Sequence, residues 1–162
     1  MEFYCKSGER IHVDILGEGF PIVFLHGNNL QSGYFAKQRI LEKSFKLLFV
    51  DSLGHGKSGE LQGETSFAYL ADSLEELLSS LSIGKCLLVG HSDGANLALE
   101  YAGRHGERVA GILANCGNIS AVSRYSGKQR KYFLFRSKVP SPLCLLSGGM
   151  ALPLFGALSS RL

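Results

Sequence analysis

The sequence of 162 residues contains no tryptophan, no aspartate or glutamate after Glu107 and no histidine after His105. Residues 1–107 carry 9 Lys and Arg against all 14 acidic residues, a balance of −5. Residues 108–162 carry 8 Lys and Arg and no acid, a balance of +8. The last third of the chain therefore supplies positive charge, but neither a carboxylate nor an imidazole.

Cysteine is scarce and is not arranged for metal binding. The four cysteines are widely spaced, form no C-x-x-C pair and have no nearby histidine at zinc-ligand spacing. We therefore predict no metal and no organic cofactor. Cys86 and Cys116, at the ends of expected strands, are predicted to pack as small apolar residues. The amino terminus has no charged region followed by an apolar one, so we predict no signal peptide and a cytoplasmic location.

Positive charge is concentrated between residues 124 and 138, among several aromatic residues. No nucleic-acid-binding motif accompanies this cluster, so we interpret it as a solvated face and expect no nucleic-acid partner. Residues 139–160 carry no charge and are numerous enough to cross a bilayer. Only 12 of these 22 residues are apolar, and prolines and glycines recur among them, so we do not expect a membrane helix. We interpret residues 118–162 as the remnant of a lid or a disordered tail.

Apolar runs alternate with helical patterns in the first 117 residues. Hairpin strands are predicted over residues 3–6 and 10–16, and buried strands over 21–25, 46–50, 86–89 and 109–114. Helices are predicted over residues 34–45, from a Ser66 N-cap to Gly84, and over 95–104. This alternation predicts an α/β domain over residues 1–117, with a mostly parallel sheet and helices on both faces.

The segment Gly90-His91-Ser92-Asp93-Gly94 follows an apolar strand and opens a helical stretch. In that context G-x-S-x-G indicates a nucleophile elbow, a tight turn that exposes a serine hydroxyl at the end of a sheet. The residues two before and two after the serine must be very small, because the strand and helix backbones nearly touch there. Gly90 and Gly94 meet this requirement. Outside such a context, the same pattern is usually an ordinary turn.

Two further motifs follow earlier strands. They are His26-Gly27-Asn28-Asn29 and the loop 51–58, which has the pattern D-x-x-G-x-G-x-S. Together with the elbow, in this order and each at the carboxyl end of a strand, they resemble the α/β-hydrolase family over about residues 1–117. Parallel sheets bind ligands at the carboxyl ends of their strands. The resemblance implies an α/β-hydrolase fold that here lacks the family's carboxyl-terminal strands.

The resemblance also implies roles for three residues. Ser92 matches the nucleophile, which forms an acyl-enzyme with a carbonyl substrate. The backbone N–H groups of Asn28 and Asp93 match the oxyanion hole, in which each donor is typically worth about 3 kcal/mol. A serine in the elbow, rather than an aspartate, favours acyl transfer on an ester, thioester or related bond. The expected partner is therefore a small-molecule acyl substrate.

Several other polar residues have structural interpretations. We expect His26 to fix its loop through backbone hydrogen bonds, His55 to brace the following loop, and Asp51 to bind local backbone N–H groups. His12 is expected at a strand surface. His91 adjoins the predicted nucleophile, but neighbouring side chains of an elbow diverge, so it is not expected to accept the serine proton.

The family's triad acid and histidine follow the serine on later loops. After Ser92 the chain offers only Asp93, Glu100, His105 and Glu107, and none matches either role. The chain ends where the family usually inserts a lid, so we expect an incomplete copy with only residual catalysis. Three interpretations stay open: a serine hydrolase, a binding module that keeps the pocket without hydrolysis, and a truncated, inactive gene product. The strand over residues 109–114 would be an exposed sheet edge and a route to self-association.

Overall fold

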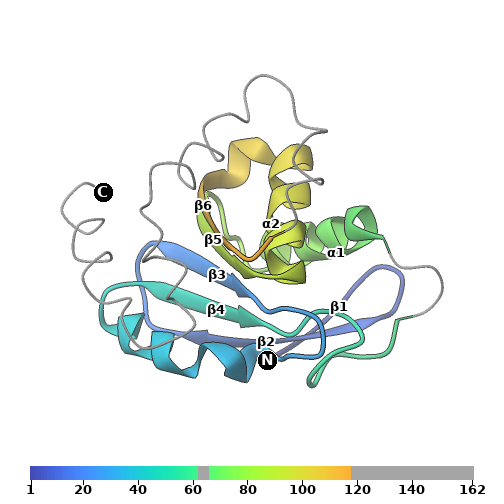
Figure 1. Cartoon of the computed structure of the whole chain (residues 1–162), viewed down its shortest axis with the longest axis horizontal. Coiled ribbons are helices and arrows are strands. Elements are labelled where there is room, and N and C mark those ends of the chain that lie inside the picture. The colour runs from blue at the N-terminus through green and yellow to red at the C-terminus, as the bar shows by residue number, and fades with distance from the viewer. Residues whose placement is uncertain (62–65, 118–162) are drawn as a thin grey trace.

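The computed structural model describes residues 1–61 and 66–117, which form a six-stranded sheet with helices packed against it (Figure 1). The strands are β1 (Glu2–Tyr4), β2 (Arg10–Leu16), β3 (Pro21–Leu25), β4 (Lys46–Val50), β5 (Cys86–His91) and β6 (Val109–Asn115). The helices are α1 (Phe67–Ser80) and α2 (Asp93–Arg104), with two 3-10 helices, η1 (Ser32–Lys43) and η2 (Gly106–Arg108). The basic cluster and the uncharged stretch predicted within residues 118–162 lie outside the described residues.

The sheet has the strand order β1-β2-β4-β3-β5-β6. The β3–β4, β3–β5 and β5–β6 pairs are parallel, whereas β1–β2 and β2–β4 are antiparallel. The predicted α/β architecture with a mostly parallel sheet is therefore confirmed. Because β3, β4 and β5 run in the same direction, the loops that follow them meet at one edge of the sheet.

Three strands differ from the prediction at their ends, by one or two residues. The first strand ends at Tyr4 rather than at residue 6, because Cys5 already belongs to the hairpin turn. Its N–H donates to the Glu9 carbonyl (2.8 Å), and its carbonyl accepts from the Gly8 N–H (2.9 Å). At the other end of the sheet, β5 continues to His91, because this residue still pairs with Asn115 of β6.

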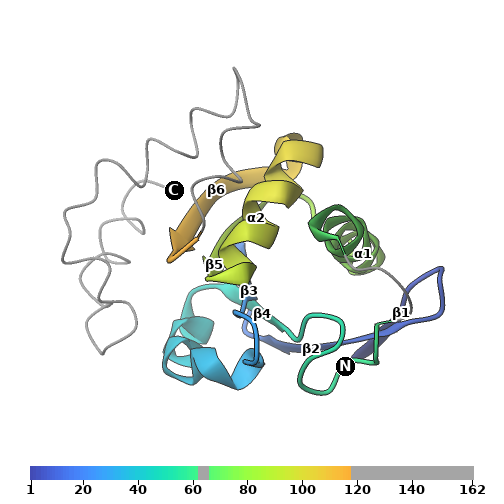
Figure 2. The same cartoon turned by 45° about the vertical axis from the view of Figure 1, so that its right-hand side comes forward.

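Helices cover both faces of the sheet, as predicted (Figure 2). Alternate residues of β3 point to opposite faces, so Val23 and Leu25 pack with α1 and α2, while Ile22 and Phe24 pack on the side of η1. Leu77 of α1 is among the fully buried side chains of the larger cluster. Burial of apolar side chains on both faces stabilises the parallel strands.

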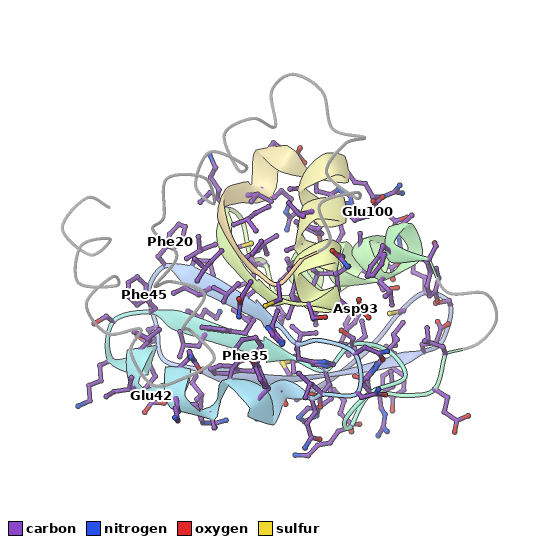
Figure 3. All side chains as sticks on the ribbon, in the orientation of Figure 1. Phe20, Phe35, Glu42, Phe45, Asp93 and Glu100 are labelled. Carbon is purple, nitrogen blue, oxygen red and sulfur yellow. The ribbon has the colours of Figure 1, made fainter. Side chains whose placement is uncertain are left out.

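The predicted helix 34–45 forms as a 3-10 helix that starts earlier and is interrupted at Phe35 (φ −94°, ψ 22°). The ring of Phe35 lies 5.2 Å from that of Phe24, which stacks on Phe49 at 4.7 Å. Figure 3 shows Phe35 pointing from η1 toward the sheet. This break falls where the segment places an aromatic ring into the core.

The Ser66 N-cap of α1 is confirmed, because its hydroxyl accepts the Tyr69 N–H at 3.1 Å. The helix ends at Ser80 instead of reaching Gly84. Ser82 adopts a left-handed backbone conformation (φ 53°), and the Ile83 N–H turns back to the Leu78 carbonyl (2.9 Å). A left-handed residue just past the last turn is a common way for a helix to end, and here it is a serine rather than the glycine.

Two buried polar side chains join the loops after β3 and β4. His26 contacts the Gly27 carbonyl through Nδ1 (2.8 Å) and accepts the Ser52 N–H at Nε2 (3.0 Å). Asp51 accepts the N–H groups of Ser32 (2.6 Å) and Lys57 (3.0 Å). Both side chains act on backbone groups, as the sequence predicted, and hold the two loops against one another.

Two sequence predictions were wrong about exposure. His12 is buried rather than at the surface, because the loop after β4 lies against it: its N–H donates to the Ser58 hydroxyl (2.9 Å), and its ring contacts Asp14 at 3.2 Å. Cys116 is exposed rather than packed, since it lies past the end of β6 with φ 57°. Cys86 is fully buried as predicted. Among the described residues, no helix has the length and apolar character to cross a membrane.

The burial of His26 predicts a pH-dependent stability. Burial lowers the pKa of His26 below its usual 6.5, against a smaller opposing effect of its hydrogen bond to Gly27. As the pH falls, the unfolded chain therefore takes up this proton before the folded protein does. The contribution to stability is complete above about pH 6.5 and is lost progressively below it.

Measured by urea denaturation, the free energy of unfolding should be lower near pH 5.5 than near pH 7.5, values chosen to straddle the usual histidine pKa of about 6.5. In an NMR titration of the folded protein, the imidazole of His26 should titrate below the usual value. A midpoint at or above the usual value would contradict this account.

Candidate active site

Ser92 lies at the junction of β5 and α2, in a sharp turn with φ 51° and ψ −117°. Positive φ is uncommon for a residue with a side chain and costs of order 1–3 kcal/mol. The surrounding backbone holds the turn in place. The Ser92 N–H donates to the Asn115 carbonyl (2.8 Å), and the Ser92 carbonyl accepts from Ala95 (2.9 Å) and Asn96 (3.1 Å). The serine predicted as nucleophile thus occupies a strained and tightly fixed strand-to-helix turn.

Gly90 and Gly94 are required by the close approach of backbones around this turn. A Cβ on Gly90 would lie 2.6 Å from the Ala95 Cα, and one on Gly94 would collide with the backbone of Leu25 and His26. The start of α2 is therefore packed directly against the end of β3, with no side chain between them. This contact fixes where the turn lies relative to the loop after β3.

The loop after β3 touches the turn itself. A Cβ built on Gly27 would lie 3.0 Å from the Cβ of Ser92 and 3.2 Å from the His91 carbonyl oxygen. Asn28 follows immediately, and Asn28 and Asp93 line one and the same cavity. Among residues 1–61 and 66–117, the backbone N–H groups of Asn28 and Asp93 donate to no acceptor. The structure therefore brings together Ser92, Asn28 and Asp93, the three residues that the sequence singled out.

Asp93 is the first residue of α2 (Figure 3). The N–H groups in the first turn of a helix have no partner within the helix, and the helix dipole places partial positive charge there. The Asp93 carboxylate accepts a hydrogen bond from the side-chain amide of Asn96 at 3.5 Å. The N–H of Asp93 and the amino end of α2 thus favour negative charge beside Ser92.

The ring of His91 is engaged by partners other than the serine hydroxyl. Its ring stacks on Tyr34 at 4.7 Å, and its Nδ1 accepts from the side-chain amide of Asn115 at 3.2 Å. Burial lowers the pKa of His91, which favours the neutral ring. No histidine ring in the described part of the chain forms a hydrogen bond with the Ser92 hydroxyl. The expectation that His91 does not serve as the base agrees with this geometry.

His55 reaches further than the sequence indicated. It braces its own loop through Nδ1, which lies 3.1 Å from the Leu53 carbonyl, as predicted. Its Nε2 also lies 3.2 Å from the Asn28 side-chain oxygen, which accepts the Asn29 N–H as well (3.0 Å). His55 therefore ties the loop 51–58 to the residue beside Ser92. Nothing in the spacing of these two loops could have revealed this contact, since 27 residues separate the partners.

A cavity of about 180 Å³ opens beside Asn28 and Asp93, between the loops after β3 and β4 and the amino ends of α1 and α2. Much of the cavity wall is formed by five apolar residues: Leu53, Leu61, Phe67, Leu70 and Leu97. Polar lining comes from His26, Asn28, Ser52, His55, Ser66 and Asp93. The described residues contain no group of three or more His, Cys, Asp or Glu side chains that could hold a metal ion.

Comparison with known proteins agrees with this geometry. The sequence profile of the alpha/beta hydrolase fold matches residues 21–138. The chain is 32% identical over 119 residues to a non-heme chloroperoxidase of Kitasatospora aureofaciens, an alignment covering 72% of this chain and 42% of that protein. It is 34% identical over 123 residues to a pimeloyl-[acyl-carrier protein] methyl ester esterase of Nitrosospira multiformis, covering 70% and 44%.

Among solved structures, a thermophilic esterase from Thermogutta terrifontis matches with a TM-score of 0.68 and 26% identity, over 73% of this chain and 45% of that one. The chain spans 39–42% of the length of the first curated relatives it matches. The matched residues include all three motifs and the strands that carry them. The chain belongs to the α/β-hydrolase fold family.

Proposed function

We propose that this chain carries the nucleophile and the oxyanion hole of a serine hydrolase that acts on an ester, thioester or related acyl bond. Ser92 is the nucleophile, and the backbone N–H groups of Asn28 and Asp93 are the oxyanion donors. The observation that carries the proposal is the strained backbone turn at Ser92. The Cβ of Ser92 lies within contact distance of the loop that leads to Asn28. Strain of this kind at a residue with a reactive side chain supports a functional role.

In the proposed reaction, the Ser92 Oγ bonds to the carbonyl carbon and the carbonyl oxygen becomes an oxyanion. The two N–H groups donate to that oxygen, and the amino end of α2 adds its partial positive charge. The bond to the leaving group then breaks and leaves an acyl-enzyme, which water hydrolyses. Each of these steps uses groups that lie at the carboxyl ends of β3 and β5.

In the proposed reaction the proton of the Ser92 hydroxyl passes to solvent water, and solvent returns a proton to the leaving group. Residues 108–162 contain no Asp, Glu or His, and His26 and His91 are engaged by other partners. Without a triad base, only the catalysis that comes from substrate binding and the oxyanion hole remains. We therefore expect Ser92 in these 162 residues to be acylated slowly.

The absence of a triad base also favours a second function, a module that binds acyl compounds without turnover. The division of the chain at residue 117 and self-association through the edge of β6 stay predictions.

Replacing Ser92 tests the nucleophile directly. A fluorophosphonate probe should label the protein, slowly, on Ser92, and Ser92→Ala should abolish the labelling while leaving the fold intact. Ser44→Ala is the matched control, because Ser44 is an exposed serine at the end of η1, and its replacement should leave labelling unchanged. Intact mass and peptide mapping report the site. Labelling that persists in Ser92→Ala, or no labelling of the folded wild type, would refute the serine hydrolase.

A methyl group at position 27 should disturb the site without removing any reactive group. The Gly27→Ala side chain would press on the Ser92 Cβ and the His91 carbonyl, neither of which can move freely. A displacement of about 1 Å at a reacting group can cost up to 100-fold in rate, and we expect labelling to slow by at least about tenfold. Gly84→Ala is the control, because nothing lies within 4 Å of its added Cβ. Equal labelling rates for the two variants would contradict the proposed proximity.

A further inference from the structure

We infer that the cavity between α1 and α2 is the subsite for the acyl chain, and that it selects neutral, unbranched chains of about six carbon atoms. This inference rests on the proposed function, since it assigns a substrate class to the same site. The cavity is lined both by Asn28 and Asp93 and by a set of leucine side chains. An acyl carbonyl whose oxygen lies between the two N–H groups would therefore direct its chain into this cavity.

The lining explains the preference for a hydrocarbon chain. Four apolar residues illustrate this lining. Leu53 and Leu97 are buried in the core, and Phe67 and Leu70 belong to the first turn of α1. Each methylene group of a bound chain that is buried against such a surface should raise the affinity about fourfold.

The charges around the cavity argue against a chain that ends in an acid. Within residues 1–61 and 66–117, the lining includes Asp93 and two histidines, but no lysine or arginine. A carboxylate at the end of the chain would therefore lose its hydration without gaining an ion pair. A neutral methyl terminus does not incur this penalty.

The volume sets the length of the chain. A cavity of about 150 Å³ lined by apolar side chains accommodates benzene, a molecule of six carbons. The cavity here measures about 180 Å³. A second hollow of about 20 Å³ adjoins it toward the core and shares Leu53, Leu70 and Leu97 with it. These three leucines line both spaces and, in this inference, close the inner end of the cavity; Leu70, in the first turn of α1, is the one that the test varies.

The test uses the unreactive 2-alkanones, from 2-butanone to 2-dodecanone, with the Ser92→Ala protein, and binding is followed by NMR shifts of the leucine methyl groups. Affinity should rise about fourfold per added methylene and level off near a chain of six carbons, as expected for burial of each group until the cavity is full. Leu70→Phe should move this limit to shorter chains, and Leu70→Ala should move it to longer ones. Leu81→Ala, at the other end of α1, should leave it unchanged.

The outcomes separate this inference from the proposed function. A chain-length limit that follows the size of residue 70 supports the subsite even if Ser92 proves unreactive in the labelling experiment. Affinity that rises with length without a limit, or a limit that Leu70→Phe does not shift in a protein that remains folded, overturns it. Equal or tighter binding of the matching (ω−1)-oxo carboxylic acids, which carry a methyl ketone at one end and a carboxylate at the other, overturns the neutral-chain preference.

Discussion

The site depends on one constraint, the direct contact between the backbones of β3, β5 and the start of α2. Gly90 and Gly94 leave no room for a side chain at this junction, so the helix begins against the ends of two parallel strands. As a result, the chain must change direction sharply between β5 and α2, and Ser92 adopts a backbone conformation with positive φ. The same contact brings the loop after β3 to the serine and leaves the Asn28 and Asp93 amides at one cavity.

The loops around this junction are held by buried polar groups as well as by apolar packing of Leu53 in the core. His26 and Asp51 accept or donate hydrogen bonds across the loops after β3 and β4, and His55 adds a contact to the side chain of Asn28. Buried polar groups that are fully paired specify a single arrangement, since any other arrangement leaves one of them unsatisfied. The geometry beside Ser92 is thus set by hydrogen bonds of residues that take no part in the bond-making steps of the proposed reaction.

The sequence predicts the parts of this fold that depend on local chemistry. Apolar runs that alternate with helical patterns predict the parallel strands. Ser66 as an N-cap predicts the start of α1, and Gly90 and Gly94 predict the tight turn. The burial of His12 depends on the loop after β4, which lies against it, and the exposure of Cys116 depends on where β6 ends, so neither follows from neighbouring residues. The contact from His55 to Asn28 and the shape of the cavity likewise arise only from tertiary packing.

The central claim is that the Ser92 hydroxyl and two backbone amides surround one reacting centre. A crystal structure of the protein after reaction with an organophosphorus probe measures this arrangement most directly. The account predicts phosphorus bonded to the Ser92 Oγ, with one phosphoryl oxygen about 2.7–3.1 Å from the backbone nitrogens of both Asn28 and Asp93. A phosphoryl oxygen directed away from these two amides, or phosphorus bonded to another residue, would contradict it.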